Sequence, residues 1–162
     1  MNNATLKNSG RQMVLVDIEN MAGTANPSPQ QVAAVHQFLS GTIQNFDEAQ
    51  CVVACSHRAA AMVAFSFPGA RHVWRSGEDG ADLALIDVLA TEGVSSRFTD
   101  VTICSGDGIF TPSVVQLAID GVDVVVISVA NFLSRRLELA AKSVIKLAWV
   151  PAWSAISTGE AI

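Results

Sequence analysis

The chain has 162 residues, of which 50% are hydrophobic and 15% charged, and its formal net charge is −5. This length fits one domain with a full core, and the negative charge argues against a general nucleic-acid coat. No apolar run reaches the roughly 18 to 20 residues that span a bilayer, and the first residues lack the apolar segment of a signal peptide. We therefore expect a cytoplasmic protein that enters no membrane. Cys51 and Cys55 would lie too far apart on one strand to form a disulfide, Cys104 falls in another strand, and none has zinc-binding spacing, so we expect three reduced core cysteines.

Apolar runs of strand length alternate with helical patterns along the chain. In chain order we expect a strand at Met13–Asp17, a helix at Gln31–Gln44, a strand at Cys51–Cys55, a helix at Arg58–Phe65, a strand at His72–Arg75, a helix at Asp79–Thr91, a strand at Val101–Cys104, a helix at Pro112–Asp120, a strand at Asp123–Val129, a helix at Arg135–Lys142 and a strand at Val144–Trp149. Such alternation is typical of a parallel sheet covered by helices.

Polar residues at the helix starts indicate where the helices begin. Ser56, Thr111 and Ser134 are expected to be N-cap residues, and Pro112 fits a first helical turn. Two helices have apolar residues spaced for an inward stripe. The residues expected to face inward are Val32, Val35, Leu39 and Ile43 in the first helix, and Leu83, Ile86 and Ala90 in the third.

The predicted fold class is α/β, a three-layer α/β/α domain with a parallel sheet of five or six strands. Right-handed crossovers and short connections leave few topologies, among them the order 3-2-1-4-5 with a switch between the first and fourth strands. We expect one domain at residues 13–150, a flexible arm at 1–12 and a tail at 151–162.

Three carboxylates follow apolar runs at points where a turn or helix begins: Asp17, Asp82 and Asp107. In an open parallel sheet the carboxyl ends of the strands form the ligand-binding edge, and the predicted order places Asp17 and Asp107 on either side of the switch point. Because hard cations such as Mg²⁺ prefer carboxylate and water ligands, this clustering predicts a divalent metal site.

Three motifs, VDIEN, GADLALIDVLA and SGDGIFTPSVVQLAIDGVDVVVIS, occur in that order between Val14 and about Leu147. Together they resemble the NYN-domain family of PIN-like ribonucleases. The resemblance implies a metal-dependent ribonuclease that uses Mg²⁺ or Mn²⁺ to hydrolyse RNA phosphodiester bonds. It implies that Asp17 and Asp107 are the principal metal ligands and catalytic residues and that Asp82 completes the acidic pocket.

The same resemblance assigns Asn20 and Ser105 to orienting water or phosphate. One position departs from it: many family members have a second Asp in the turn after Asp107, where this chain has Ile109. Loss of that carboxylate would leave one metal ion instead of two, or no activity. Asp79 shares a helix face with Asp82, but it is equally explained as a first-turn residue favoured by the helix dipole.

Several cations are candidates for contacts with RNA. Arg135 and Arg136 stand at a helix start, where the dipole disfavours positive charge, so phosphate binding is one explanation and solvation the other. Arg58, with Arg71 and Arg75, extends this candidate set into a basic rim. The expected partner is RNA, single-stranded or structured, and a homodimer is left open. Trp149 and Trp153 are expected to cover the sheet edge or a subunit contact, with base stacking as the alternative.

Two other functions remain as alternatives. A catalytically weak or inactive PIN-like module would bind RNA or protein, having lost activity with the carboxylate that Ile109 replaces. A haloacid-dehalogenase-like phosphatase has the same sheet order, but it needs the opening motif DxDx(T/V) and a lysine before its late acidic turn. Here Asp17 is followed by Ile18, Glu19 and Asn20, and no lysine occurs between residues 7 and 142.

Overall fold

The computed structural model of the chain describes residues 10–148. The predictions for residues 1–9 and for the tail, including those for Trp149 and Trp153, lie outside the described residues. Within the described part, no helix is long and apolar enough to cross a membrane. Cys51, Cys55 and Cys104 are free thiols, as expected.

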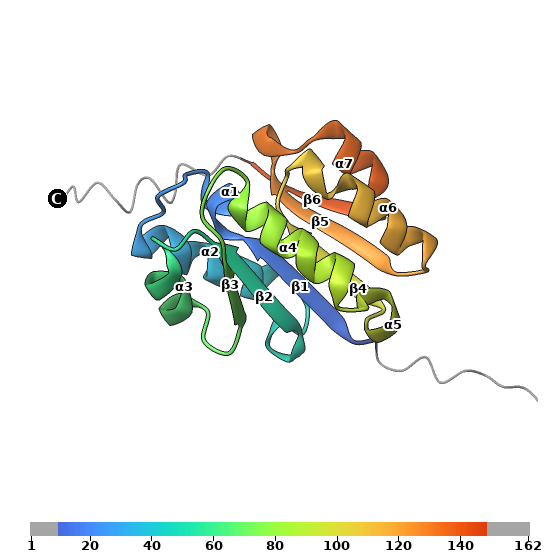
Figure 1. Cartoon of the computed structure of the whole chain (residues 1–162), viewed down its shortest axis with the longest axis horizontal. Coiled ribbons are helices and arrows are strands. Elements are labelled where there is room, and N and C mark those ends of the chain that lie inside the picture. Colours follow the sequence, from blue (N-terminus) through green and yellow to red (C-terminus); the bar gives the residue numbers. More distant parts are fainter. Residues whose placement is uncertain (1–9, 149–162) are drawn as a thin grey trace, which may run out of the picture.

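A six-stranded, all-parallel sheet forms the centre of the molecule (Figure 1). Its strands are β1 (Gln12–Asp17), β2 (Gln50–Cys55), β3 (Arg71–Trp74), β4 (Asp100–Cys104), β5 (Asp123–Val129) and β6 (Ser143–Leu147). Their order is β3-β2-β1-β4-β5-β6. The predicted fold class and strand order are therefore confirmed, and the sixth strand extends the sheet beyond β5.

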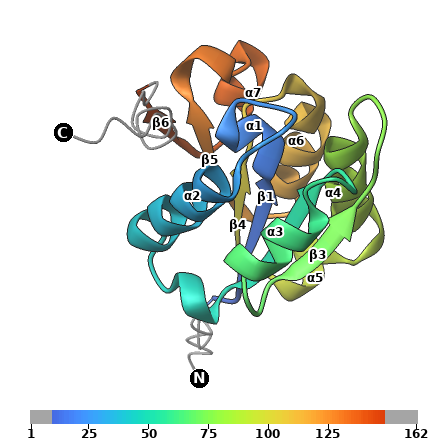
Figure 2. The same cartoon turned by 90° about the vertical axis from the view of Figure 1, so that its left-hand side faces the viewer.

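Helices cover both faces of the sheet, so the domain has three layers (Figures 1 and 2). One face packs against α1 (Ile18–Ala22), α2 (Pro29–Thr42) and α3 (Ala60–Ser66). The other packs against α4 (Gly80–Thr91), α5 (Val94–Arg97), α6 (Thr111–Ile119) and α7 (Arg135–Ala140). Short 3-10 helices are η1 (Phe46–Glu48), η2 (Gly108–Phe110) and η3 (Ala130–Phe132). Periodicity did not predict α1 or α5, because five and four residues are too few to show a helical repeat.

The three predicted N-caps are wrong in their side-chain contacts. Helix α3 begins later than expected, after Ala59, and the hydroxyl of Ser56 is buried without a hydrogen-bond partner. Thr111 is already helical because η2 runs directly into α6, although Pro112 does occupy the first turn. Ser134 occupies the N-cap position of α7 with extended backbone, but its side chain makes no capping hydrogen bond.

The inward face of α4 also differs from the prediction. Its buried apolar side chains are Ala81, Leu85 and Val88, whereas Ala90 is exposed. The helix is apolar around most of its circumference, so spacing alone did not identify the packed face. The observed rotation buries Asp82 against the sheet. In α2, by contrast, the predicted stripe is correct: Val32, Val35 and Leu39 are buried, as is Ile43 at its C-cap.

Candidate functional site

Asp17 lies at the carboxyl end of the central strand β1, one of the two strands that border the switch point. Its backbone is extended and its carboxylate caps α1, accepting a hydrogen bond from the backbone N–H of Asn20 at 3.2 Å. Only 4% of the residue is exposed, because the strand is covered on both faces. The burial and the cap fix Asp17 in one orientation at the edge of the sheet.

The turn after β4 brings Asp107 to the same edge. Ser105, which is fully buried, donates a hydrogen bond to Asp17 at 3.4 Å and accepts one from the backbone N–H of Asp107 at 3.3 Å. The carboxylate of Asp107 accepts a hydrogen bond from the backbone N–H of Ile109 at 2.9 Å. Ser105 therefore connects the two acidic segments that the sequence predicted to meet.

Gly106 allows this turn to lie close to its neighbours. A Cβ atom there would stand 2.2 Å from the hydroxyl of Ser128 and 2.4 Å from the carbonyl oxygen of Phe132, so no side chain fits without a shift. The backbone N–H of Gly106 donates to the side-chain oxygen of Asn20 at 3.0 Å. Asn20 thus joins the ends of β1 and β4.

The loop between β3 and α4 and the first turn of α4 supply the other two acidic residues of the site. Asp79 adopts the left-handed conformation, with φ of 53°, and precedes α4 without making a side-chain capping bond. Gly80 follows it at a point where a Cβ would stand 2.3 Å from the carbonyl oxygen of Arg75. Asp82 lies in the first turn of α4. The carboxylate of Asp79 is therefore not used by the helix and is available to the site.

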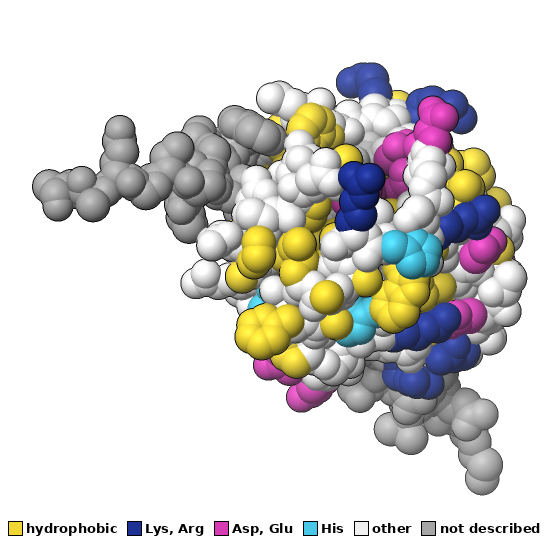
Figure 3. Space-filling view, turned by 60° about the vertical axis from the view of Figure 1, so that its left-hand side comes forward, with side chains coloured by type: hydrophobic (Ala, Val, Ile, Leu, Met, Phe, Trp, Pro, Cys, Tyr) yellow, Lys and Arg dark blue, Asp and Glu magenta, His cyan; other side chains and the backbone are white. Residues whose placement is uncertain are grey.

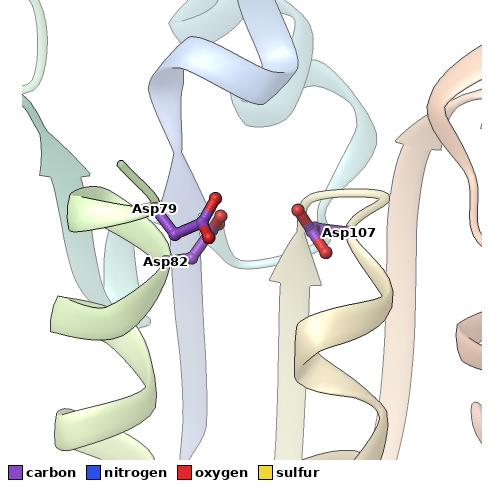
Figure 4. A group of neighbouring side chains, drawn as sticks. All are labelled: Asp79, Asp82 and Asp107. Carbon is purple, nitrogen blue, oxygen red and sulfur yellow. The ribbon is translucent and has the colours of Figure 1, made fainter. Parts of the chain in front are cut away.

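Asp79, Asp82 and Asp107 form a cluster in which one carboxylate oxygen of each lies within 4.8 Å of the others. Figure 4 shows Asp79 and Asp82, from the start of α4, pointing toward Asp107 beyond the end of β4. Asp17 lies outside this set of three but shares a hydrogen bond with Asp82. The structure thus brings the three predicted acids to one place and adds Asp79 as a cluster member, with Asp17 next to the cluster.

The electrostatics of this region are unfavourable for four ionised acids. The pKa of Asp82 is raised to about 9, chiefly by burial and further by the hydrogen bond to Asp17 and the charges of Asp17, Asp107 and Asp79. Burial also raises the pKa of Asp17, although hydrogen bonds from Asp82 and from the backbone of Asn20 favour its ionised form. At neutral pH and without a cation, Asp82 therefore carries a proton and donates it in a hydrogen bond to Asp17.

The residues present fit a hard divalent cation. Only 8% of Asp82 is exposed, and its Oδ1 atom is buried without a hydrogen-bond partner. A buried polar atom without a partner costs about 1 to 3 kcal/mol, and a cation coordinated by this oxygen would remove that cost. Carboxylate oxygens are the ligands that Mg²⁺ and Mn²⁺ prefer. The cluster of Asp79, Asp82 and Asp107 could therefore hold a metal ion.

A cavity of about 180 Å³ opens beside the cluster. Its lining residues are Asp17, Glu19, Asn20, Gly77, Asp79, Gly80, Ala81 and Asp82. Glu19 accepts a hydrogen bond from the backbone N–H of Ser56 at 2.9 Å, so it joins the end of β1 to the end of β2. The cavity is polar and acidic, with room for a cation and its water ligands.

Ile109 is half-buried and packs against the apolar core on the α4 and α6 side of the sheet. It contributes only a backbone N–H to the site. Asp79 supplies a third clustered carboxylate from a different segment, so the number of acids does not depend on position 109. Asp79 was not predicted to be a ligand, because a left-handed residue before a helix has no periodic signal.

The other predicted residues lie at varying distances from the cluster. Asn20 and Ser105 lie beside it, and their hydrogen bonds to Gly106, Asp17 and Asp107 indicate that they position the carboxylates. The start of α7 touches the turn of Asp107, since the backbone N–H of Ser134 donates to the carbonyl of Gly106 at 2.8 Å.

The exposed residues Arg135 and Arg136 follow Ser134 immediately, so they lie near the acidic site. Arg58 is exposed in the turn between β2 and α3, on the β2 side of the same sheet edge. The cations therefore flank the acidic cluster from two sides and do not enter it.

Comparison with known proteins adds information on the fold. No protein-family model and no curated protein matches the chain. It is similar to the crystal structure of a protein of unknown function from Vibrio parahaemolyticus, with a TM-score of 0.62 and 16% sequence identity. The match covers 86% of this chain and 94% of the other. At this identity the likeness shows a shared α/β fold alone.

Proposed function

We propose that this protein is a metal-dependent ribonuclease that hydrolyses RNA phosphodiester bonds at the cluster of Asp79, Asp82 and Asp107. The observation that carries the proposal is the buried Oδ1 atom of Asp82, which lacks a hydrogen-bond partner and lies among other carboxylates. A bound cation would relieve this arrangement, because without one the acids raise one another's pKa. The resemblance of the motifs to the NYN-domain ribonucleases points to the same chemistry.

The residues of the site divide into ligands and supports. Asp79, Asp82 and Asp107 would hold Mg²⁺ or Mn²⁺, with Asp17 beside Asp82. A bound divalent ion would stabilise the charge that develops on the phosphodiester and lower the pKa of an attacking water. Ser105 fixes Asp17 and Asp107 relative to each other through its two hydrogen bonds.

The arginines flanking the site would contact RNA phosphates. Arg135 and Arg136 are exposed at the start of α7, which is hydrogen-bonded through Ser134 to the turn that carries Asp107. Cations at a helix start are disfavoured by the dipole, so a phosphate partner explains their position better than the helix does. A protein of net charge −5 needs such local cations to approach a polyanion.

The test combines metal binding with cleavage. The melting temperature of the wild-type chain should rise with Mn²⁺ concentration, because the ion binds only the folded state, and the protein should cleave RNA. Asp107→Asn removes one ligand charge with little change in shape and should abolish both effects while the chain stays folded. Asp47→Asn, an exposed acid in η1 at the opposite edge of the sheet, is the matched control and should change neither.

The two readouts separate the alternatives. Cleavage that persists in excess chelator, or full metal-dependent cleavage by Asp107→Asn, would refute the proposal. Mn²⁺ binding and RNA binding without cleavage would instead identify an inactive PIN-like module. A protein that hydrolyses phosphomonoesters but not RNA would support the phosphatase alternative.

A further inference from the structure

Trp74 is a large aromatic side chain left half-exposed at the carboxyl end of the edge strand β3. It pairs in register with Cys55 of β2, and Ala54 of β2 pairs with Asp17 of β1. Trp74 therefore stands at the same edge of the sheet as the acidic cluster. Two strand spacings, about 10 Å, separate β3 from β1.

The chain between Trp74 and Asp79 is held in one compact conformation. The backbone N–H of Gly80 donates to the carbonyl of Gly77 at 3.1 Å. The hydroxyl of Ser76 lies 2.7 Å from Nδ1 of His57, which ties this loop to the turn after β2. These hydrogen bonds therefore hold the backbone that links Trp74 to Asp79, the first residue of the acidic cluster along the chain.

Two arginines near Trp74 are available to contact a polyanion. Arg58 and Arg75 are exposed in the turns that follow β2 and β3, whereas Arg71 lies at the amino end of β3 and is paired with Glu92 at 2.5 Å. Among the described residues Arg58 has no ion pair, and Arg75 is paired with Asp87 only at 3.6 Å, with both side chains largely exposed. Such an exposed pair contributes little free energy and exchanges readily for a phosphate.

Figure 3 shows this side of the molecule, where Lys or Arg and His side chains adjoin exposed hydrophobic side chains over α3 and β3. The same view has acidic side chains beside this basic and apolar area. A surface that combines cations with an exposed aromatic ring is typical of proteins that bind single-stranded nucleic acid.

We propose that Trp74 is a stacking platform for a base of single-stranded RNA, whose backbone passes from the acidic cluster along the carboxyl ends of β2 and β3. Arg58 and Arg75 contact phosphates on this path. The inference rests on the proposed ribonuclease function and adds a substrate class to it. Single strands are favoured over duplexes because a stacked duplex base offers no free face to the indole ring.

The experiment measures the affinity of a labelled oligouridylate by fluorescence anisotropy in Mg²⁺, with Asp107→Asn present in every protein to prevent cleavage. Trp74→Ala should weaken binding roughly 5- to 150-fold. Trp74→Phe keeps an aromatic face and should retain most of the affinity. Phe65→Ala is the matched control, because Phe65 is 87% exposed near the end of α3 that points away from the acidic edge, and it should leave binding unchanged.

A second measurement keeps the test valid if Trp74→Ala does not fold. In a chain with Trp149→Phe and Trp153→Phe, Trp74 is the remaining tryptophan, and its fluorescence should be quenched by the oligonucleotide. Unchanged affinity in a folded Trp74→Ala protein, absence of quenching, or an equal loss of affinity for a blunt RNA duplex would overturn the inference. So would a Trp74-dependent self-association without any effect on RNA.

Failure of the two proposals can be told apart. Trp74-dependent RNA binding without Mn²⁺ stabilisation or cleavage would refute the ribonuclease and leave Trp74 as an RNA contact. Metal-dependent cleavage of RNA that does not depend on Trp74 would refute the stacking platform alone.

Discussion

Replacing Asp82 by asparagine tests whether the acidic cluster is strained without a cation. In the folded chain the pKa of Asp82 is raised from 3.8 to about 9, chiefly by burial. Between these two pH values Asp82 is protonated in the folded chain and ionised in the unfolded chain. The free energy of unfolding therefore decreases as the pH rises through this range. Wild-type stability in chelator should therefore fall from pH 5 to pH 8.

The size of the effect follows from the pKa difference. Each pKa unit corresponds to 1.36 kcal/mol, so keeping Asp82 protonated at pH 7 costs at most about 4 kcal/mol. An asparagine side chain at this position would carry no such cost, and its amide N–H would still donate to Asp17. We expect Asp82→Asn to stabilise the metal-free protein by about 1 to 4 kcal/mol at pH 7, and by less at pH 5. For a chain of this size each kcal/mol raises the melting temperature by about 2 to 4 °C.

Thermal unfolding followed by circular dichroism, in chelator and in excess Mn²⁺ at several pH values, measures this effect. Asp82→Asn should melt above the wild type in chelator and should lose most of the Mn²⁺-dependent increase. Asp87→Asn, an exposed acid on the same helix, is the matched control and should change stability by less than about 0.5 kcal/mol. The reasoning is refuted if Asp82→Asn is less stable than the wild type in chelator at pH 7, or if their difference does not grow with pH.

Two further changes test the residues that position the carboxylates and the arginines beside the site. Asn20→Ala leaves the buried N–H of Gly106 without its acceptor. Urea denaturation should therefore show that the free energy of unfolding falls by about 1 to 3 kcal/mol. Asn26→Ala, at an exposed position, is the control, and an equal or larger decrease in that variant would contradict the role of Asn20. The double change Arg135→Ala and Arg136→Ala should weaken RNA binding. It should also reduce the slope of log affinity against log salt concentration by about 0.7 for each phosphate that the two arginines neutralise. An unchanged affinity at low salt would show that both arginines are only solvated.

The sequence by itself determined the parts of this protein that depend on local pattern. Apolar runs predicted all six strands, and the alternation with helices predicted a parallel sheet with β1 and β4 as neighbours. That order was enough to bring Asp17 and Asp107 to one edge of the sheet, because the carboxyl ends of parallel strands share an edge regardless of side-chain conformation. The helical stripe of α2 was predictable for a similar reason: its outer face is polar enough to reveal the buried one.

Only the tertiary structure decided the details that depend on contacts between distant segments. The hydrogen bonds from Gly106 to Asn20 and from Ser56 to Glu19 join residues 86 and 37 positions apart, and no local pattern encodes them. The position of Asp79 depends on a left-handed residue and on the close approach of Gly80 to Arg75. The rotation of the apolar helix α4, which buries Asp82, was set by packing against β1, β2 and β3, since a helix with apolar residues on most sides has no preferred face of its own.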